Sequence, residues 1–136
     1  MRFMVLVKAS KQSEAGILPS EQELTSMGKF NDELVKAGVL LAGDGLQPSA
    51  KGARIQFSGA KRSVVDGPFT ETKELLAGFW IVQMKSMEEA VEWFKRAPFV
   101  DGELELRQIF EEADFGELVA KVPKVFEAER AFKDKQ

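Results

Sequence analysis

Apolar residues occur along the chain in short runs separated by polar, glycine-containing segments, and their spacing predicts the elements. Residues 3–7 are apolar at every position, which is typical of a strand in the middle of a sheet. The longest apolar run, 75–82, contains aromatic and β-branched residues and predicts a second central strand. Shorter strands are expected at 39–42 and at 104–110, where leucines alternate with charged residues. Gly43 and Gly45, on either side of Asp44, are expected to bend the chain after the first of these.

Two amphipathic helices are expected between these strands. Ser20 and Glu23 have the spacing of a capping box, and apolar residues then recur every three or four positions as far as Gly38, a typical residue just beyond a helix C-terminus. Ser86 and Glu89 repeat the capping pattern before a second apolar stripe that a proline ends. Each helix therefore has one face suited to packing on a sheet.

The order of the elements predicts the fold class. Residues 54–65 have the pattern of a β-hairpin, so the order is β-α-β-hairpin-β-α-β. This is the split β-α-β plan, an α+β ferredoxin-like antiparallel sheet with two helices on one face and the hairpin as an insertion. We expect one domain over 1–110 and, over 111–136, a helical C-terminal extension that packs on the domain or on a partner subunit.

With both helices on one side, the other face of the sheet is left without a covering layer. Exposed apolar area costs about 25 cal/mol per Å², so a partner is expected on that face, and the simplest partner is a second copy of the chain. The sequence thus predicts a two-fold homodimer.

Charge and hydropathy narrow the set of partners. Nineteen Lys and Arg oppose 22 Asp and Glu, a formal net charge of −3, with both signs spread along the chain. No basic surface for nucleic acid is expected. The apolar run at 3–7 is too short for a signal-peptide core or a membrane span, so we expect no membrane partner and a cytoplasmic location.

Cysteine and histidine are both absent. Disulfides, thiolate nucleophiles and Ser-His or Cys-His mechanisms are thereby excluded, as is the one side chain that titrates near neutral pH without perturbation. Acidic residues at 111–114 lack the spacing of a calcium loop, so we predict neither a metal nor a cofactor.

Residues Asp66–Glu74, with the order Asp-Gly-Pro-Phe-Thr-Glu-Thr-Lys-Glu, resemble the signature of the bacterial DGPF-domain proteins within the YCII-related superfamily. Residues 37–48, 76–80 and 87–93 support the resemblance, which covers about residues 1–110. It implies a ferredoxin-like fold of the dimeric α+β barrel type, with a cleft between sheet and helices that serves small-molecule binding or catalysis. Related proteins carry a His–Asp pair that cannot be transferred to a chain without histidine.

The signature and its surroundings supply the candidate site residues. Two interpretations stay open for Asp66–Phe69, a ligand site or a structural turn whose aspartate caps backbone amides. Strand alternation after the turn would place Thr70 and Thr72 on one side and Lys73 on the other. The ligand-binding candidates are Asp66, Thr70, Thr72, Lys73, Arg54 and Phe79, and the catalytic candidates are Asp66, Lys73 and Asp44.

Three functions are compatible with the sequence. The first is binding of a small organic ligand in a cleft between sheet and helices of a homodimer. The second is an enzyme that uses carboxylate or lysine acid–base chemistry on a small activated carbon acid or lactone. The third is a regulatory or scaffolding dimer. A cleft with one polar anchor would favour the first, and converging acid and base groups would favour the second.

Overall fold

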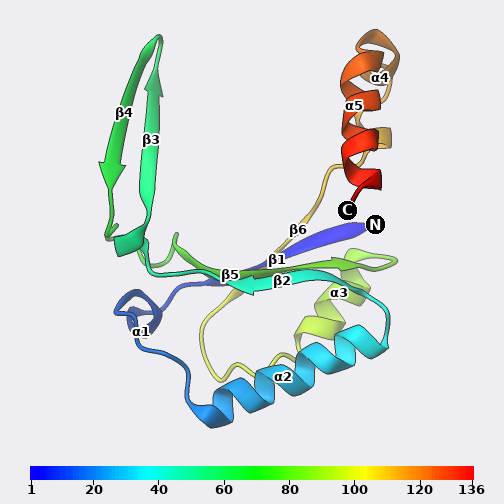
Figure 1. Cartoon of the computed structure of the whole chain (residues 1–136). Helices are drawn as coiled ribbons and strands as arrows, with labels where there is room; N and C mark the ends of the chain where they lie inside the picture. The colour runs from blue at the N-terminus through cyan, green and yellow to red at the C-terminus, as the bar shows by residue number, and fades with distance from the viewer.

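The computed structural model describes residues 1–136 and is built on a four-stranded antiparallel sheet with the strand order β2-β5-β1-β6. The strands are β1 (Arg2–Lys8), β2 (Leu40–Gly45), β5 (Leu76–Gln83) and β6 (Leu104–Gln108). The helices α2 (Glu21–Lys36) and α3 (Met87–Phe94) cover one face (Figure 1). This order confirms the ferredoxin-like α+β prediction, with both long apolar runs as central strands.

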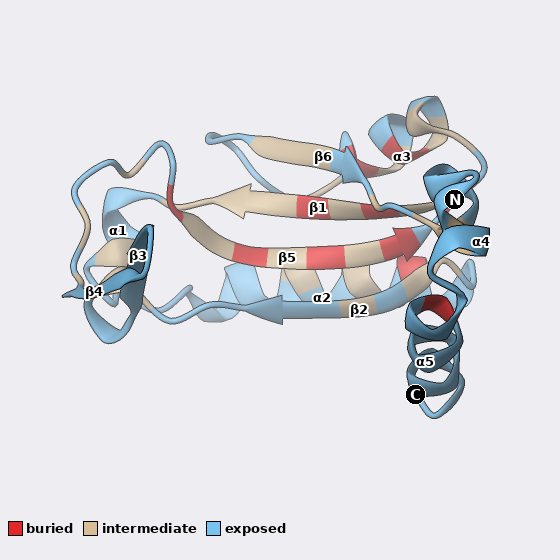
Figure 2. Ribbon diagram, turned by 90° about the horizontal axis from the view of Figure 1, so that it is seen from above, coloured by how far each residue is buried: buried red, intermediate tan, exposed pale blue.

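The core lies between the sheet and these two helices. Along β1, Phe3 and Val5 are fully buried on the helix side, whereas the intervening Met4 and Leu6 are only half-buried on the other side. Burial therefore alternates along the strand because only one face of the sheet has a helical layer (Figure 2). The core cluster comprises Phe3, Val5, Phe30, Leu34, Trp80, Val82, Met84, Ala90 and Phe94.

The N-terminal cap of α2 agrees with the sequence. Ser20 Oγ accepts from the Glu23 amide, and the Glu23 carboxylate accepts from the Ser20 amide. At the other end, Gly38 has φ +72°, a left-handed conformation that suits glycine. The cap and the terminating glycine thus fix the length of this helix as expected.

Three local expectations were wrong. α3 ends at Phe94, ahead of the proline expected to stop it. The polar connection after β1 contains a short helix, α1 (Lys11–Glu14), which no apolar periodicity signalled. The chain was expected to bend at Gly43–Gly45, but these residues continue β2, and the irregularity in its pairing with β5 lies earlier, between Leu40 and Ala42.

The inserted hairpin stands apart from the main sheet. β3 (Ala53–Ser58) and β4 (Lys61–Asp66) pair only with each other, as a separate two-stranded sheet. The apolar side chains of Ile55, Phe57 and Val64 are exposed. A two-stranded hairpin is only marginally stable in water unless its apolar side packs against another element. No element of this chain covers these three side chains.

The segment after β6 is helical. It contains η2 (Glu112–Phe115), α4 (Leu118–Lys121) and α5 (Pro123–Asp134). Phe126 is buried, and its ring lies 5.5 Å from that of Phe115. The hairpin and this segment rise from the face of the sheet opposite α2 and α3, at its two ends (Figures 1 and 2). The division into a domain and an extension stays a prediction. None of the helices is long and apolar enough to cross a bilayer.

An ion pair ties the start of β1 to the C-terminal segment. Arg2 Nη2 lies 2.6 Å from Glu111 Oε1. The hydrogen bonds that the Arg2 side chain donates to Glu111 lower the pKa of Glu111 below its ordinary value of 4.5. A carboxyl group whose folded pKa is lowered stabilises the protein above its ordinary pKa and loses that effect as the pH falls through the lowered pKa.

The change Arg2→Met tests this pairing. Both side chains are partly exposed, so we expect a loss of about 1 kcal/mol or less in the free energy of unfolding at neutral pH. The loss should shrink as the pH falls through the lowered pKa of Glu111, because the carboxylate is then neutralised in the folded wild-type protein. Urea denaturation at several pH values measures it, and a loss independent of pH would contradict the assignment.

Candidate functional site

A cavity of about 410 Å³ opens between the sheet and α2, and we call it the cleft. Its floor is formed by β1, β2 and β5, one wall by α2, and its rim by the segments before α2 and after α3. The residues lining it are Val7, Pro19, Met27, Asn31, Gly43, Asp44, Gly45, Ala77, Gly78, Phe79, Trp80 and Phe99. A cavity of this size is in the range of small-molecule sites.

Three glycines on the helix side of the sheet leave room for the cleft. Gly45 pairs with Gly78 and Gly43 pairs with Trp80, and directly opposed residues of antiparallel strands project to the same side. Trp80 is buried on the helix side, so all three glycines face the helices there. In place of side chains the floor has bare backbone at these positions, which we call the glycine floor.

The three glycines differ in what they tolerate. A Cβ at Gly43 would meet Trp80 Cδ1 at 2.9 Å, and one at Gly78 would meet the Asp44 carbonyl oxygen at 3.0 Å. At Gly45 the nearest atom would be 3.9 Å away, an ordinary contact. A side chain at Gly45 therefore extends into the cleft without disturbing its floor.

The cleft has one well-defined polar anchor. Trp80 Nε1 donates a hydrogen bond of 2.9 Å to Asn31 Oδ1, which fixes the orientation of the Asn31 amide. The Nδ2 group of that amide has two further donors and no partner within the protein. Phe99 lies edge-on to Trp80, with ring centroids 6.4 Å apart, so an aromatic pair stands beside the amide.

The structure brings only two of the candidate residues to the cleft. Asp44 and Phe79 pair with each other across β2 and β5 and border the cleft at the sheet. By alternation from Trp80, however, their side-chain positions belong to the opposite face. Asp66, Thr70, Thr72, Lys73 and Arg54 do not line it.

The signature forms a tightly packed turn beyond the hairpin. A Cβ at Gly67 would lie 1.7 Å from the Ser49 carbonyl oxygen, so the two backbone segments touch there. The Phe69 amide donates to Ser49 Oγ at 3.0 Å, and the Ser49 amide donates to the Glu14 carboxylate at 2.9 Å. Arg54 stacks on the Phe69 ring at 3.8 Å. These contacts join the signature to the 3₁₀ helix η1 (Ser49–Lys51) and to α1.

The expected alternation of the residues after the turn was wrong. Residues 70–74 form turns, in which the Thr72 amide donates to the Thr70 carbonyl and the Glu74 amide to the Glu71 carbonyl. β5 begins only at Leu76, so Lys73 is exposed on a turn and is not held beside Glu71 or Glu74 in an ion pair.

The acidic corner at 111–114 is occupied by partners within the chain. Arg2 binds Glu111, and Arg130 binds Glu112. Asp114 accepts from the Glu111 amide at 2.8 Å. The hydrogen bond that Arg130 donates to Glu112 also lowers the pKa of Glu112. These carboxylates hold the C-terminal segment in place.

The split β-α-β topology, with a cleft between the sheet and a helix, defines an α+β protein of the ferredoxin-like class. The model of the YCII-related domain matches residues 1–113, so the chain belongs to the YCII-related family.

Two known proteins show similarity to the chain. An uncharacterized protein of Rhizobium meliloti (strain 1021) is 33% identical over 73 residues, which are 54% of this chain and 59% of that protein. The chain thus matches less than two thirds of that relative's length. A 5-chloro-2-hydroxyhydroquinone dehydrochlorinase from Burkholderia phenoliruptrix AC1100, solved with 2,5-dihydroxybenzoquinone, aligns with a TM-score of 0.42 at 15% identity, over 82% of this chain and 97% of its own.

Sequence reasoning missed the residues that give the cleft its shape. Asn31 was not among the candidates, because it lies within a helix beside Asp32 and Glu33 and belongs to no motif. The glycines on β2 were interpreted as a bend, and Gly78 was part of a family motif only. The pairing register of β2 with β5 is what brings them together, and no local pattern gives that register.

Proposed function

We propose that the protein binds a small planar organic ligand in the cleft. The observation that carries the proposal is the glycine floor, which faces α2 across the cleft, beside the Trp80–Asn31 pair. Glycine weakens a strand unless something else approaches its backbone closely. Close contacts within the chain account for Gly43, which lies under Trp80, and for Gly78, which lies against the Asp44 carbonyl. Gly45 has no such contact, and a flat ligand against the sheet would account for it.

The lining indicates the class of ligand. Trp80 and Phe99 supply aromatic surface, and Asn31 supplies amide donors for an oxygen acceptor. No lysine or arginine lines the cleft, which disfavours phosphates and other strongly anionic ligands. A neutral aromatic or quinone-like molecule with a carbonyl or hydroxyl oxygen fits these features best.

We also propose that the protein acts as a homodimer joined through the open face of the sheet. Met4 and Leu6 on β1 and Ile81 on β5 form an apolar centre there that no helix of the same chain covers. The hairpin and the C-terminal segment flank this face and would enclose a second copy. Light scattering should give twice the 15.1 kDa chain mass or a multiple of it, and Leu6→Glu should lower that mass.

A thermal-shift screen with hydroxylated aromatics, quinones and aromatic ketones tests the ligand proposal. A ligand at about 100 times its Kd stabilises the folded protein by about 2.7 kcal/mol, enough to raise the Tm by several degrees. The substitution Gly45→Leu fills the cleft and should abolish the rise. Asn31→Leu removes the anchor and should reduce it.

The matched control is Gly28→Leu. Gly28 lies exposed on α2 with no atom within 4 Å of an added Cβ, so leucine there leaves the cleft unchanged and its helix propensity is better. The control should keep the full ligand-dependent rise. A hit that Gly45→Leu retains in full would place the ligand elsewhere, with Asp66, Thr70, Thr72, Lys73 and Arg54 as the next residues to replace.

A further inference from the structure

The strand β6 presents an unpaired edge to solvent. It hydrogen-bonds only to β1, where the Lys8 amide donates to the Glu103 carbonyl and the Ile109 amide donates to the Arg2 carbonyl. Because hydrogen-bonding direction alternates along a strand, the amides and carbonyls of Leu104, Leu106 and Gln108 point outward. Figure 2 shows β6 at the border of the sheet with no strand beyond it.

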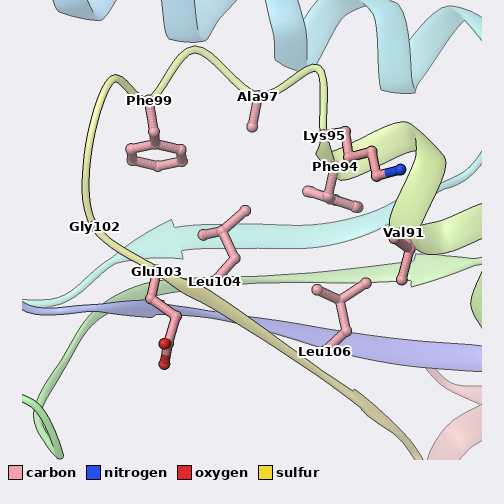
Figure 3. A pocket seen from close by; sticks show the side chains of 9 residues that line it. All are labelled: Val91, Phe94, Lys95, Ala97, Phe99, Gly102, Glu103, Leu104 and Leu106. Carbon is pink, nitrogen blue, oxygen red and sulfur yellow. The ribbon is translucent and has the colours of Figure 1, made fainter.

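An empty apolar groove runs beside this edge. A cavity of about 280 Å³ is bounded by α3, the segment that follows it and β6. Leu104 and Leu106 point into it toward Phe94, whereas Glu103 points to the other side (Figure 3). Side chains of a further strand beside β6 would enter this groove, since they would continue the layer that the two leucines form. An added strand would therefore satisfy the unpaired edge with its backbone and fill the groove with its side chains.

The other edge of the sheet is irregular, whereas β6 is regular. β2 has a pairing irregularity after Leu40, followed by Gly43 and Gly45, and such features discourage a further strand. β6 pairs with β1 without any irregularity. A regular edge is a template for another strand. The charged residues of β6, Glu105 and Arg107, oppose such pairing unless they meet opposite charges on the added strand.

We propose that β6 pairs antiparallel with β6 of a second copy, in the register that places Leu106 opposite Leu106. Outward-pointing groups occur only at even-numbered residues, so only even residues can form the hydrogen-bonded pairs. In this register Leu104 pairs with Gln108 of the partner subunit, and Glu105 lies opposite the partner's Arg107 on both sides of the axis. Glu105 already bonds to Lys8 at 3.1 Å and to Arg107 at 3.3 Å within its own chain, so the partner's Arg107 would join an existing ion-pair cluster.

Neighbouring registers bring like charges together. A shift of one pair toward the N-terminus would place Glu105 opposite the partner's Glu105, between two pairs of Glu103 with the partner's Arg107. The opposite shift would place Arg107 opposite the partner's Arg107. Only the register centred on Leu106 has opposite-charge pairs and no like-charge pair. Like charges directly opposite each other destabilise a strand pair. Charge complementarity thus selects a second copy in one register as the occupant. This contact is independent of the ligand proposal and, combined with packing through the open face, would give a dimer of dimers.

A disulfide test reads this register directly, because the chain has no cysteine of its own. In a non-hydrogen-bonded pair the two Cα atoms are about 4.5 Å apart, within the range of a disulfide, whereas diagonal neighbours are about 7–8 Å apart. Glu105→Cys and Arg107→Cys proteins are mixed while reduced, allowed to exchange subunits and then oxidised. We expect a disulfide between the two variants and little disulfide in either variant alone.

Reversing the charge at position 107 is the second test of the register. Arg107→Glu should weaken association through this edge by about tenfold, because it creates two like-charge pairs. Glu105 also binds Lys8 of its own chain, at 3.1 Å. The triple change Lys8→Glu, Glu105→Arg and Arg107→Glu restores opposite charges across the edge, keeps opposite charges at positions 8 and 105, and should recover the association. Absence of the mixed disulfide, or equal disulfide yield in the single-variant samples, would overturn the proposal. Pairing with an unrelated peptide in place of a second copy would leave the protein without any such crosslink.

Discussion

Replacing Gly67 with alanine should destabilise the fold by about 3 kcal/mol or more. The added Cβ would lie 1.7 Å from the Ser49 carbonyl oxygen, and that atom belongs to backbone that cannot rotate away as a side chain can. The signature turn and η1 must then separate, and the bond from the Phe69 amide to Ser49 Oγ is lost with them. Urea denaturation followed by circular dichroism measures the change.

Gly52→Ala is the control for this substitution. Gly52 lies in the same region, and its Cβ would meet the Ser49 carbonyl oxygen at 3.4 Å with an ordinary backbone conformation. We expect a change of about 1 kcal/mol or less. If Gly67→Ala is as mild as Gly52→Ala, the signature is not held against η1 in the way described.

Phe94→Ala should cost about 3–5 kcal/mol, because it removes a large buried ring from the centre of the core. The ring centroid of Phe94 lies 5.5 Å from that of Phe30 and 5.2 Å from that of Trp80, so the cavity would open between both helices and the sheet. Chemical denaturation provides the free energy, and Phe94→Leu should recover a large part of it.

The exposed neighbour Glu92 provides the comparison on the same helix. Glu92→Ala removes only a surface ion pair with Lys95, so a change within about 0.5 kcal/mol is expected. A small effect at Phe94 would contradict the position of α3 on the sheet. Since Phe94 supports Trp80, its replacement should also weaken any ligand bound beside that tryptophan.

The fold could be predicted from the sequence because its signals are local. The apolar run at 3–7 and the cap formed by Ser20 and Glu23 each depend on neighbouring residues alone, and the structure has both. α1 was missed because Ser10 and Ser13 cap a helix with no apolar stripe. Residues 70–74 were misplaced on a strand because the turn after Pro68 extends further than its sequence signals indicate.

The candidate site was harder to predict because it depends on contacts between distant segments. Gly45 and Gly78 become neighbours only through the register of β2 with β5. Asn31 faces the cleft because Trp80, 49 residues later in the chain, bonds to it. The conspicuous signature instead packs against Ser49, which in turn bonds to Glu14, so a distinctive sequence motif here has a structural explanation of its own.

Trp80 fluorescence measures occupation of the cleft most directly. The chain has two tryptophans, and Trp93→Phe leaves Trp80 as the only reporter, with its ring in the wall of the cleft. Titration with a ligand from the thermal-shift screen should quench Trp80 emission to saturation, and adding Gly45→Leu should weaken that binding by about 100-fold or more. A ligand that raises the Tm but leaves Trp80 emission unchanged, or that binds the Gly45→Leu protein equally well, would show that the cleft is not the binding site.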